Sequence, residues 1–200
     1  DIIQTLILVN IYRLAMSAFN MLVVLGSTAS GKTKLAVELA RVLNGEIISA
    51  DSRQVYRGLD IGSGKDLDEY QEIKHHLIDI VDPGYEYNIF DFQKNVIDAY
   101  QAITHQDKLA IMAGGSALYV DSILKGYRLI EVPENVALRA TLATLSHEQL
   151  IQQLMRLKPN LHNTTDIIER DRLVRAIEIA QGELASQDSI NDFPALKPLI

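Results

Sequence analysis

The sequence predicts an α/β fold in which a mostly parallel β-sheet is covered by helices on both faces. Short apolar segments typical of buried strands alternate with amphipathic helical segments between residues 21 and 113. Strands that are separated by helices must be joined by crossover connections, which place neighbouring strands in parallel. Ligands of such folds bind at the carboxyl ends of the strands, so the residues that directly follow each strand are the first candidates for function.

Each element of this fold has a local signal. Apolar runs predict strands at residues 21–25, 46–50, 76–80 and 109–113. Apolar side chains at intervals of three and four over residues 32–43, followed by Asn44-Gly45, predict a helix that ends there. A second helix is expected at residues 90–104.

The chain changes character after Pro133, where strand-like alternation stops and the spacing of the leucines predicts several helices. We therefore expect a core at residues 21–132 and an inserted helical subdomain at residues 133–182. Residues 183–200 are expected to return toward the core and to be cut short. Residues 1–20 are interpreted as an N-terminal extension to which no function is assigned.

Composition narrows the class of protein. The chain has 200 residues, and its hydrophobic content of 48% suffices for a buried core. The absence of cysteine excludes disulfides, thiolate zinc sites and thiol nucleophiles, and an intracellular, cytoplasmic enzyme is expected. The net charge of -7 would repel phosphates, so any nucleic-acid site must be a local basic patch. The apolar run at residues 6–9 is far shorter than the about 20 residues of a membrane span, and no membrane partner is expected.

The segment between the first strand and the first helix is a phosphate-binding loop. Its sequence, GSTASGKT at residues 26–33, matches the pattern G-x-x-x-x-G-K-[ST] in the required place after a strand and before a helix. Backbone N–H groups at the positive end of the helix would hold phosphate oxygens, Lys32 would add charge, and the Thr33 hydroxyl suits Mg²⁺. The loop predicts a P-loop NTPase-like, three-layer fold, but it leaves ATPases, kinases and diphosphate-consuming transferases open.

Asp51 is the carboxylate best placed beside this loop, because it directly follows the strand at residues 46–50. The strand at residues 109–113 ends in Gly114-Gly115 and lacks the terminal carboxylate with which many ATPases hold Mg²⁺. Asp51 could hold a metal through water, act as a general base, or cap the next helix. The residues alone leave these roles open.

Longer strings of residues resemble the tRNA dimethylallyltransferase family. They are TASGKT at 28–33, ISADSRQVY at 48–56, LDIG at 59–62, HHLIDIVDP at 75–83, DF at 91–92, GGSALY at 114–119 and RDRLVRAIE at 170–178. The resemblance covers about residues 22–179, much more than the phosphate-binding loop alone. Members of this family are longer than 200 residues, so the chain is expected to be a fragment or a degenerate paralogue.

The resemblance implies transfer of a dimethylallyl group from its diphosphate to N6 of the adenosine 3′ of the anticodon in tRNA. It implies a catalytic set of Asp51 as general base, Lys32, and Thr33 as the ligand of Mg²⁺, with the departing diphosphate stabilised electrostatically. The implied diphosphate-binding residues are Gly26, Thr28, Ala29, Ser30, Gly31, Lys32 and Thr33. The enzyme is expected to be a monomer with dimethylallyl diphosphate and tRNA as its substrates.

Contact with tRNA is implied on both sides of Pro133, and the target adenine must leave the base stack to be reached. The implied contacts are Asp51, Ser52, Arg53, Gln54, Ser116, Arg139, Asp171, Arg172, Leu173, Val174 and Arg175. Arginines of the last stretch would supply the phosphate contacts that the overall charge does not. The alternative for them is an ion-paired helix surface with Glu169, Asp171 and Glu178. At Asp171 the family usually has Gln, so this chain has a negative charge at an implied tRNA contact.

Three other functions remain open from the sequence. The same loop could bind ATP in a small-molecule kinase, with Asp51 activating an acceptor hydroxyl. Prenyl transfer to free AMP or ADP would make the protein an adenylate isopentenyltransferase. A non-enzymatic RNA-binding remnant would bind tRNA without turnover.

The adjacent His75 and His76 lack the spacing of a metal site, and a structural or channel-lining role is expected for them.

Overall fold

The computed structural model describes residues 19–27, 29–61, 63–65, 67–127, 129–159, 167–185 and 194–200. These residues form two compact units. The core unit contains the described residues up to Tyr127 and those from Pro194 onward, and the helical unit contains those from Leu129 to Ala185. Most of the extension predicted at residues 1–20 lies outside the described residues.

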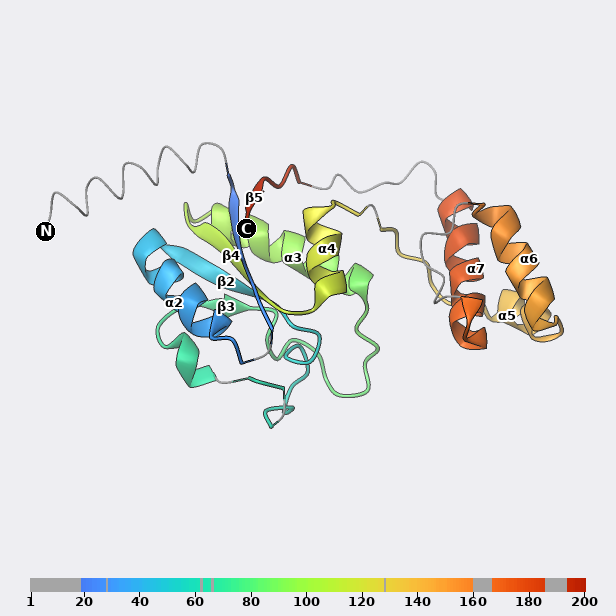
Figure 1. Ribbon diagram of the computed structural model, residues 1–200, viewed down its shortest axis with the longest axis horizontal. Helices are drawn as coiled ribbons and strands as arrows, with labels where there is room; N and C mark the ends of the chain where they lie inside the picture. The colour runs from blue at the N-terminus through green and yellow to red at the C-terminus, as the bar shows by residue number, and fades with distance from the viewer. Residues whose placement is uncertain are drawn as a thin grey trace, which may run out of the picture. The chain divides into compact units, whose positions relative to one another are not determined.

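The core unit is built on a parallel sheet in which the described strands have the order β3-β2-β4-β1-β5 (Figure 1). The strands are β1 (Met21–Leu25), β2 (Gly45–Ala50), β3 (His75–His76), β4 (Leu109–Gly114) and β5 (Pro198–Leu199). Gly114 is paired with Leu25 on one side and with Ala50 on the other. Three central strands therefore end side by side, and the segments that follow them meet at one edge of the sheet.

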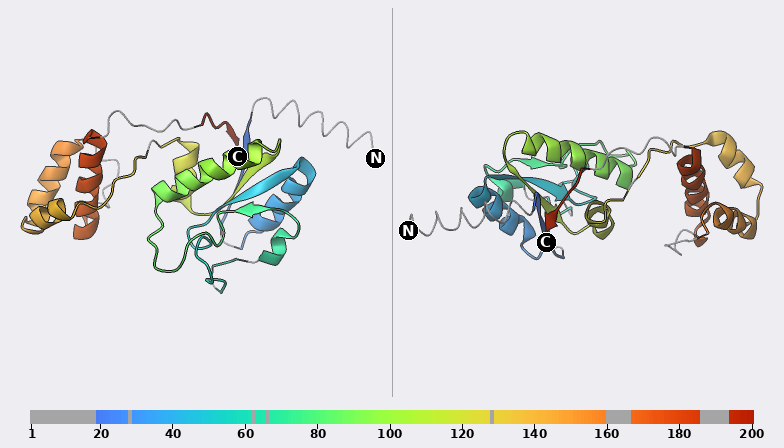
Figure 2. Two further views of the ribbon diagram at one scale, coloured as in Figure 1. Left: turned by 180° about the vertical axis from the view of Figure 1, so that it is seen from behind. Right: turned by 90° about the horizontal axis from the view of Figure 1, so that it is seen from above.

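Helices cover both faces of this sheet, as Figures 1 and 2 show. On one face, Ile47 and Ile111 pack with Ala36 and Ala40 of α2 (Lys32–Leu43). On the other face, the next residues along β2 and β4 pack with α3 (Ile89–Thr104) and α4 (Ala117–Leu124). Successive strand residues point to opposite faces, so each central strand contributes to two cores. The predicted α/β fold with three layers and a parallel sheet is confirmed.

The strand expected at residues 76–80 is much shorter, which is the main departure of the core from the prediction. Leu77 and Asp79 have φ angles of 64° and 55°, a left-handed conformation that cannot continue a strand. The amides of Asp79 and Ile80 instead donate to the carbonyls of Gln54 and Val55, at 3.0 and 2.9 Å. The segment after β3 is thereby folded against the loop that follows β2.

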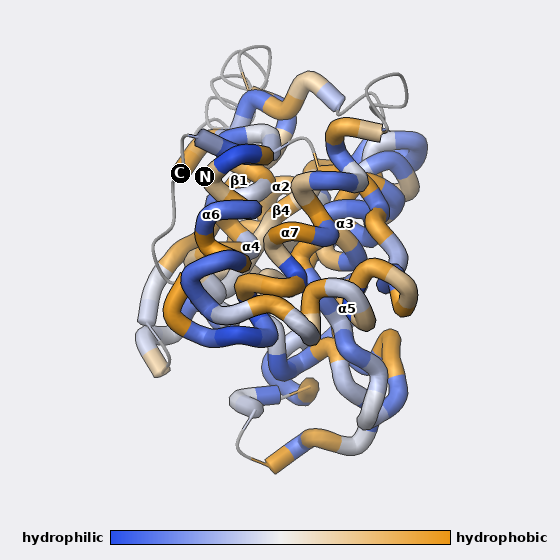
Figure 3. Tube along the Cα trace, turned by 90° about the vertical axis from the view of Figure 1, so that its right-hand side faces the viewer, coloured by the Kyte–Doolittle hydropathy of each residue, from blue (hydrophilic) through white to orange (hydrophobic). Residues whose placement is uncertain are grey.

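The helical unit consists, in its described part, of α5 (Val136–Ala143), α6 (His147–Leu157) and α7 (Arg170–Ala185). Its core contains Leu142, Leu150, Leu154, Leu173 and Ile177, each with no exposed surface. Figure 3 shows apolar and polar residues interspersed along these helices, the pattern of helices with one buried face. None of the helices in the described ranges is both long and apolar enough to cross a membrane.

Candidate active site

A cavity of about 660 Å³ lies where β2 and β4 end, beside the phosphate-binding loop. Its lining includes Gly31, Lys32 and Thr33 from the loop and Asp51 from the end of β2. The end of β4 contributes Ala113 and Gly114 to the same cavity. The structure therefore brings together the loop and the carboxylate that the sequence analysis expected to lie beside it.

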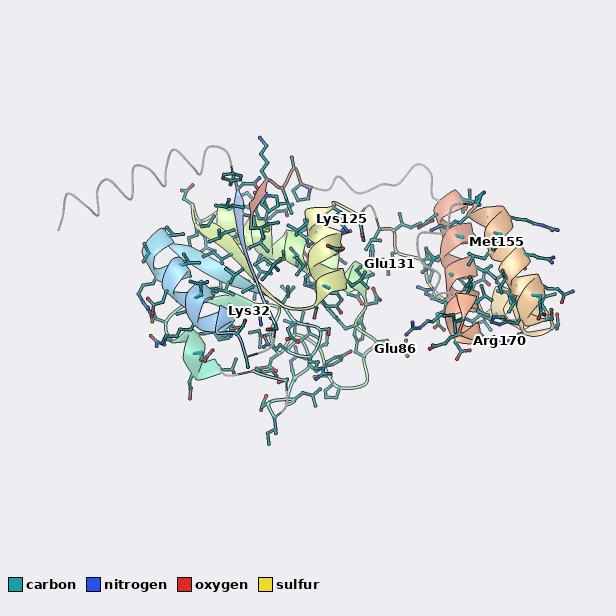
Figure 4. All side chains as sticks on the ribbon, in the orientation of Figure 1. Lys32, Glu86, Lys125, Glu131, Met155 and Arg170 are labelled. Atoms are coloured by element: carbon teal, nitrogen blue, oxygen red, sulfur yellow. The ribbon has the colours of Figure 1, made fainter. Side chains whose placement is uncertain are left out.

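The loop owes its shape to two residues in the left-handed region. Ala29 and Gly31 have φ angles of 61° and 81°, and α2 begins at the next residue, Lys32. The amino-terminal turn of α2 leaves N–H groups without helical partners, and these favour an anion. The Nζ atom of Lys32 donates to the carbonyl of Ser27, a residue of the loop, at 2.6 Å. Figure 4 labels Lys32 at the start of α2. Thr28 lies outside the described residues.

Glycines at the end of β4 let the strands approach the loop closely. A Cβ atom on Gly114 would lie 2.2 Å from the carbonyl oxygen of Ala50, a distance that no side chain can occupy. A Cβ atom on Gly115 would lie 3.0 Å from the carbonyl oxygen of Gly26. Packing between β2 and β4 thus requires a glycine at position 114, and the contact at Gly115 with the loop is tight.

Asp51 does not cap a helix. Its Oδ1 accepts the amide of Arg53 at 2.9 Å, and the residues that follow form turns. The side chain is half-buried and lines the cavity. Of the three roles that the sequence left open, general base and metal ligand through water are compatible with this geometry.

The residues after Asp51 are held by hydrogen bonds of the Ser52 backbone and of the Gln54 side chain. The amide of Ser52 donates to Oγ of Ser116, the residue before α4, at 3.0 Å. Gln54 is buried, where its Oε1 accepts the Ser49 hydroxyl at 2.8 Å and its Nε2 donates to the carbonyl of Gly64 at 3.2 Å. Ser52 and Arg53 are exposed. The amide group of Gln54 is therefore used inside the protein, whereas Ser52 and Arg53 present their side chains to solvent.

Lys65 is a cavity residue that the sequence reasoning missed. Its side chain has no exposed surface, and Nζ donates to the Tyr56 carbonyl at 2.9 Å, to Asp60 at 3.2 Å and to Asp79. Burial alone would lower the pKa of Lys65, but the hydrogen bonds to Asp79 and Asp60 outweigh it and raise the pKa. The charged Lys65 side chain therefore links the segment after β2 to the segment after β3 through ion pairs. A lysine in a polar loop gives no sequence signal that it will be buried.

Tyr70 closes another side of the cavity and is only 4% exposed. Burial, followed by the charges of Glu69 and Asp51, raises the pKa of Tyr70 to about 12. Its ring lies 4.6 Å from the ring of His75. This hydroxyl stays protonated at neutral pH, and His75 serves as a packing partner.

His76 belongs to an ion cluster around Glu46 near the start of β2. The buried Glu46 carboxylate lies 2.7 Å from Nε2 of His76, 2.6 Å from Lys108 and 3.5 Å from Lys74. Burial opposes the charge on Glu46, but the hydrogen bonds from Lys108 and His76 lower its pKa. Across the described part of the chain, no cluster of three or more His, Asp or Glu side chains could hold a metal by itself.

The arginines predicted to contact tRNA in the helical unit are engaged in ion pairs and hydrogen bonds. Arg139 and Arg175 both contact Glu178, whose side chain has no exposed surface. Arg172 pairs with Glu169 at 3.1 Å, and Arg170, labelled in Figure 4, donates to the carbonyls at the end of α5.

Their neighbours in the same stretch differ in exposure. The Leu173 side chain is buried in the core of the helical unit, Val174 is half-buried, and Asp171 is exposed. The side chain of Leu173 therefore cannot reach a ligand. The geometry fits the ion-paired helix surface for Arg172 and shows a more specific arrangement around Glu178.

Comparison with known proteins identifies the family. The model of the IPP transferase family matches residues 54–196 of the chain. The chain belongs to the IPP transferase family. It is 59% identical to tRNA dimethylallyltransferase 1 of Geotalea daltonii over 182 residues, which cover 91% of this chain and 59% of the relative. It is 55% identical to tRNA dimethylallyltransferase 2 of Syntrophotalea carbinolica, covering 90% of this chain and 61% of the relative.

Two solved structures have a similar fold. The full-length tRNA isopentenylpyrophosphate transferase of Bacillus halodurans is 33% identical, with a TM-score of 0.54 over 88% of this chain and 57% of that one. A eukaryotic dimethylallyltransferase acting on tRNA, 24% identical, shares the fold with a TM-score of 0.72 over 90% of this chain and 47% of that one. The chain spans about three fifths of the length of the curated relatives named above.

The predicted site residues of this chain fall into two groups. The phosphate-binding loop, Asp51 and the segment after it lie around one cavity in the core unit. Arg139 and Arg175 meet at Glu178 in the helical unit. Each group is a candidate site within its own unit.

Proposed function

We propose that the complete enzyme transfers a dimethylallyl group from dimethylallyl diphosphate to N6 of the adenosine 3′ of the anticodon in tRNA, releasing diphosphate. The observation that carries this proposal is the cavity that the phosphate-binding loop and Asp51 line together. The names of the relatives, tRNA dimethylallyltransferase, support the same reaction. In the proposed enzyme the core unit is catalytic, and the helical unit is a tRNA-binding insertion.

The loop suits a leaving group whose negative charge increases during the reaction. Breaking the bond between the allylic carbon and oxygen leaves the electron pair on the diphosphate, and N–H groups at the start of α2 stabilise that charge. Lys32 adds a positive charge from the same side of the cavity. Residues 26 and 28–33 form the diphosphate-binding stretch of the proposal.

Asp51 is the proposed general base. As the new bond forms between N6 and the allylic carbon, one N6 proton must leave, and the Asp51 carboxylate accepts it. Its position at the end of β2, facing the cavity that contains Lys32 and Thr33, supports this role. The Asx turn to Arg53 orients the carboxylate through Oδ1.

Magnesium is the proposed metal. The Thr33 hydroxyl and the Asp51 carboxylate supply hard oxygen donors on one cavity, which fits Mg²⁺ better than softer metals. Mg²⁺ is usually bound through one or two protein oxygens together with substrate phosphates, and this cavity offers such protein oxygens. When bound, the ion would neutralise part of the diphosphate charge, and Thr33 is the residue proposed to hold it.

For tRNA, the proposed contacts near the cavity are the exposed Ser52 and Arg53 together with Ser116, which is hydrogen-bonded to Ser52. The buried Gln54 would hold this segment in place through its hydrogen bonds with Ser49 and Gly64. The remaining proposed contacts are Arg139 and residues 171–175 of the helical unit.

We propose that the enzyme is a monomer and that it acts in the cytoplasm, where tRNA is available.

The test uses the full-length enzyme with tRNA, Mg²⁺ and dimethylallyl diphosphate, followed by mass analysis of the nucleosides. Asp51→Ala is expected to lower the transfer rate by about 10²- to 10⁴-fold while leaving diphosphate binding intact. Lys32→Ala is expected to weaken both. Equal loss of binding in the Asp51 variant would contradict the base role. Phosphoryl transfer from ATP, or prenylation of free AMP in preference to tRNA, would refute the proposed function.

A further inference from the structure

Glu178 brings two arginines from different helices to one buried carboxylate. Arg139 of α5 donates from Nε and Nη2 to its two oxygens, both at 2.8 Å. Arg175 of α7 donates from Nη1 to Oε2 at 3.2 Å, and the amide of Asn135 donates to Oε1 at 2.9 Å. The Glu178 side chain has no exposed surface, so the orientation of both guanidinium groups is set from inside the helical unit.

Both arginines remain partly open to solvent, with 36% of each side chain exposed. A guanidinium carries five N–H groups in a fixed plane. Contacts with Glu178 and Glu134 use three of those of Arg139. Contacts with Glu178 and the Val132 carbonyl use two of those of Arg175. Among the described residues, these contacts leave N–H groups on both planes for an external acceptor.

The charge of this cluster does not explain RNA binding. Arg139 and Arg175 are balanced by Glu134 and Glu178, and the whole chain carries a net charge of -7. A neutral cluster attracts a polyanion only weakly at long range. The cluster instead fixes the orientation of the guanidinium groups. A guanidinium held in a fixed plane can donate two parallel hydrogen bonds to a phosphate.

We propose that Glu178 is a positioning residue for RNA binding, which holds the Arg139 and Arg175 guanidinium groups ready for phosphodiester oxygens. This inference rests on the proposed function, because it takes tRNA as the ligand. The proposal predicts the direction in which RNA affinity changes when the charge of Glu178 is removed. If charge alone governed binding, removing the negative charge of Glu178 would strengthen RNA binding, whereas loss of positioning weakens it.

The first experiment measures tRNA affinity of the full-length enzyme and of Glu178→Gln. The dissociation constant is expected to rise at least about tenfold, since charge-assisted hydrogen bonds are lost when the guanidinium groups reorient. Glu183→Gln is the matched control on the same helix, where Glu183 pairs with Lys158 at 2.7 Å and is 37% exposed. The control removes the same charge and is expected to bind tRNA as tightly as the wild type or slightly more tightly.

Two further variants separate positioning from stability. Arg139→Lys keeps the charge and loses the bidentate contact, and it is expected to weaken tRNA binding by a similar factor. Leu150→Ala removes a fully buried side chain of the helical core but leaves the Glu178 cluster intact. Circular dichroism defines a temperature at which each variant is folded, and there Leu150→Ala is expected to bind like the wild type.

The outcomes are distinguishable. Failure of the wild-type enzyme to bind tRNA would overturn the proposed function, and this inference with it. If the wild type binds, equal or tighter binding by Glu178→Gln and Arg139→Lys would overturn the inference and leave the proposed function standing. If Glu178→Gln does not fold, Arg139→Lys decides alone. Weak binding by Leu150→Ala in its folded state would show that stability, and not orientation, controls the affinity.

Discussion

Replacement of Lys65 by methionine tests how the wall of the cavity is built. Methionine keeps most of the side-chain stem and removes the ammonium that joins Asp60, Asp79 and the Tyr56 carbonyl. Asp79 belongs to the segment after β3, whereas Asp60 and Tyr56 belong to the loop after β2. The substitution therefore leaves these two segments without their buried ionic connection.

The expected cost follows from the exposure of the partners. Removal of one member of a buried ion pair typically costs about 3–5 kcal/mol. Here the Asp79 and Asp60 side chains are 34% and 67% exposed, so water can hydrate them after the loss. We expect the free energy of unfolding of the core unit to fall by about 2 kcal/mol. Two carboxylates left without a counter-charge are also expected to raise the KM for dimethylallyl diphosphate.

The assay is urea denaturation of the full-length enzyme, with steady-state kinetics on the same preparations. Lys125→Met is the matched control, because Lys125 pairs with Asp121 at 2.6 Å on the exposed side of α4 (Figure 4). It is expected to change neither quantity. Adding Asp79→Asn to Lys65→Met should reverse part of the increase in KM, since the second substitution removes one of the two unpaired negative charges. Equal stability and equal KM for the Lys65 and Lys125 variants would refute the reasoning.

Two other predictions concern pH and packing. Folding lowers the pKa of Glu178 from 4.5 to about 2, through the hydrogen bond from Arg139 against the opposing effect of burial. This stabilisation is complete well above pH 4.5 and is lost as the pH falls toward 2. The unfolding free energy of the helical unit should drop by about 2–3 kcal/mol over that window, and the drop should disappear in Glu178→Gln. Gly114→Ala places a Cβ atom 2.2 Å from the Ala50 carbonyl oxygen and should destabilise the core unit by about 3 kcal/mol or more in thermal unfolding. Gly115→Ala, with its nearest contact at 3.0 Å, should be milder, and an equal effect of the two would contradict the packing argument.

The central elements of the fold could be predicted because each has its own local signal. The residues of β1 and α2 match their predicted bounds, since a short apolar run and a helical repeat ending at Asn44 are local features. The short β3 could not be predicted, because the positive φ angles of Leu77 and Asp79 depend on contacts with the loop after β2. Neither residue is a glycine, so nothing in the local sequence indicates the turn.

The same distinction applies to the site. The meeting of Lys32, Thr33 and Asp51 could be predicted, since parallel strands bring their carboxyl ends to one edge of the sheet. The burial of Lys65 depends on Asp79, fourteen positions further along the chain, and has no local pattern. Likewise, the shared partner of Arg139 and Arg175 follows from the packing of α5 on α7, which the leucine spacing suggests only in outline.

The pairing of β5 with β1 has a consequence for synthesis on the ribosome. Asn20, just before β1, exchanges hydrogen bonds with Lys197 across 177 positions of sequence. At translation rates of 5–20 residues per second, roughly 10–35 s pass between the emergence of these two segments. The outer edge of β1 stays open during that interval, while every residue of the helical unit is made. Nascent chains are therefore most exposed to edge-to-edge association just before β5 arrives, and chaperone protection would matter most at that stage.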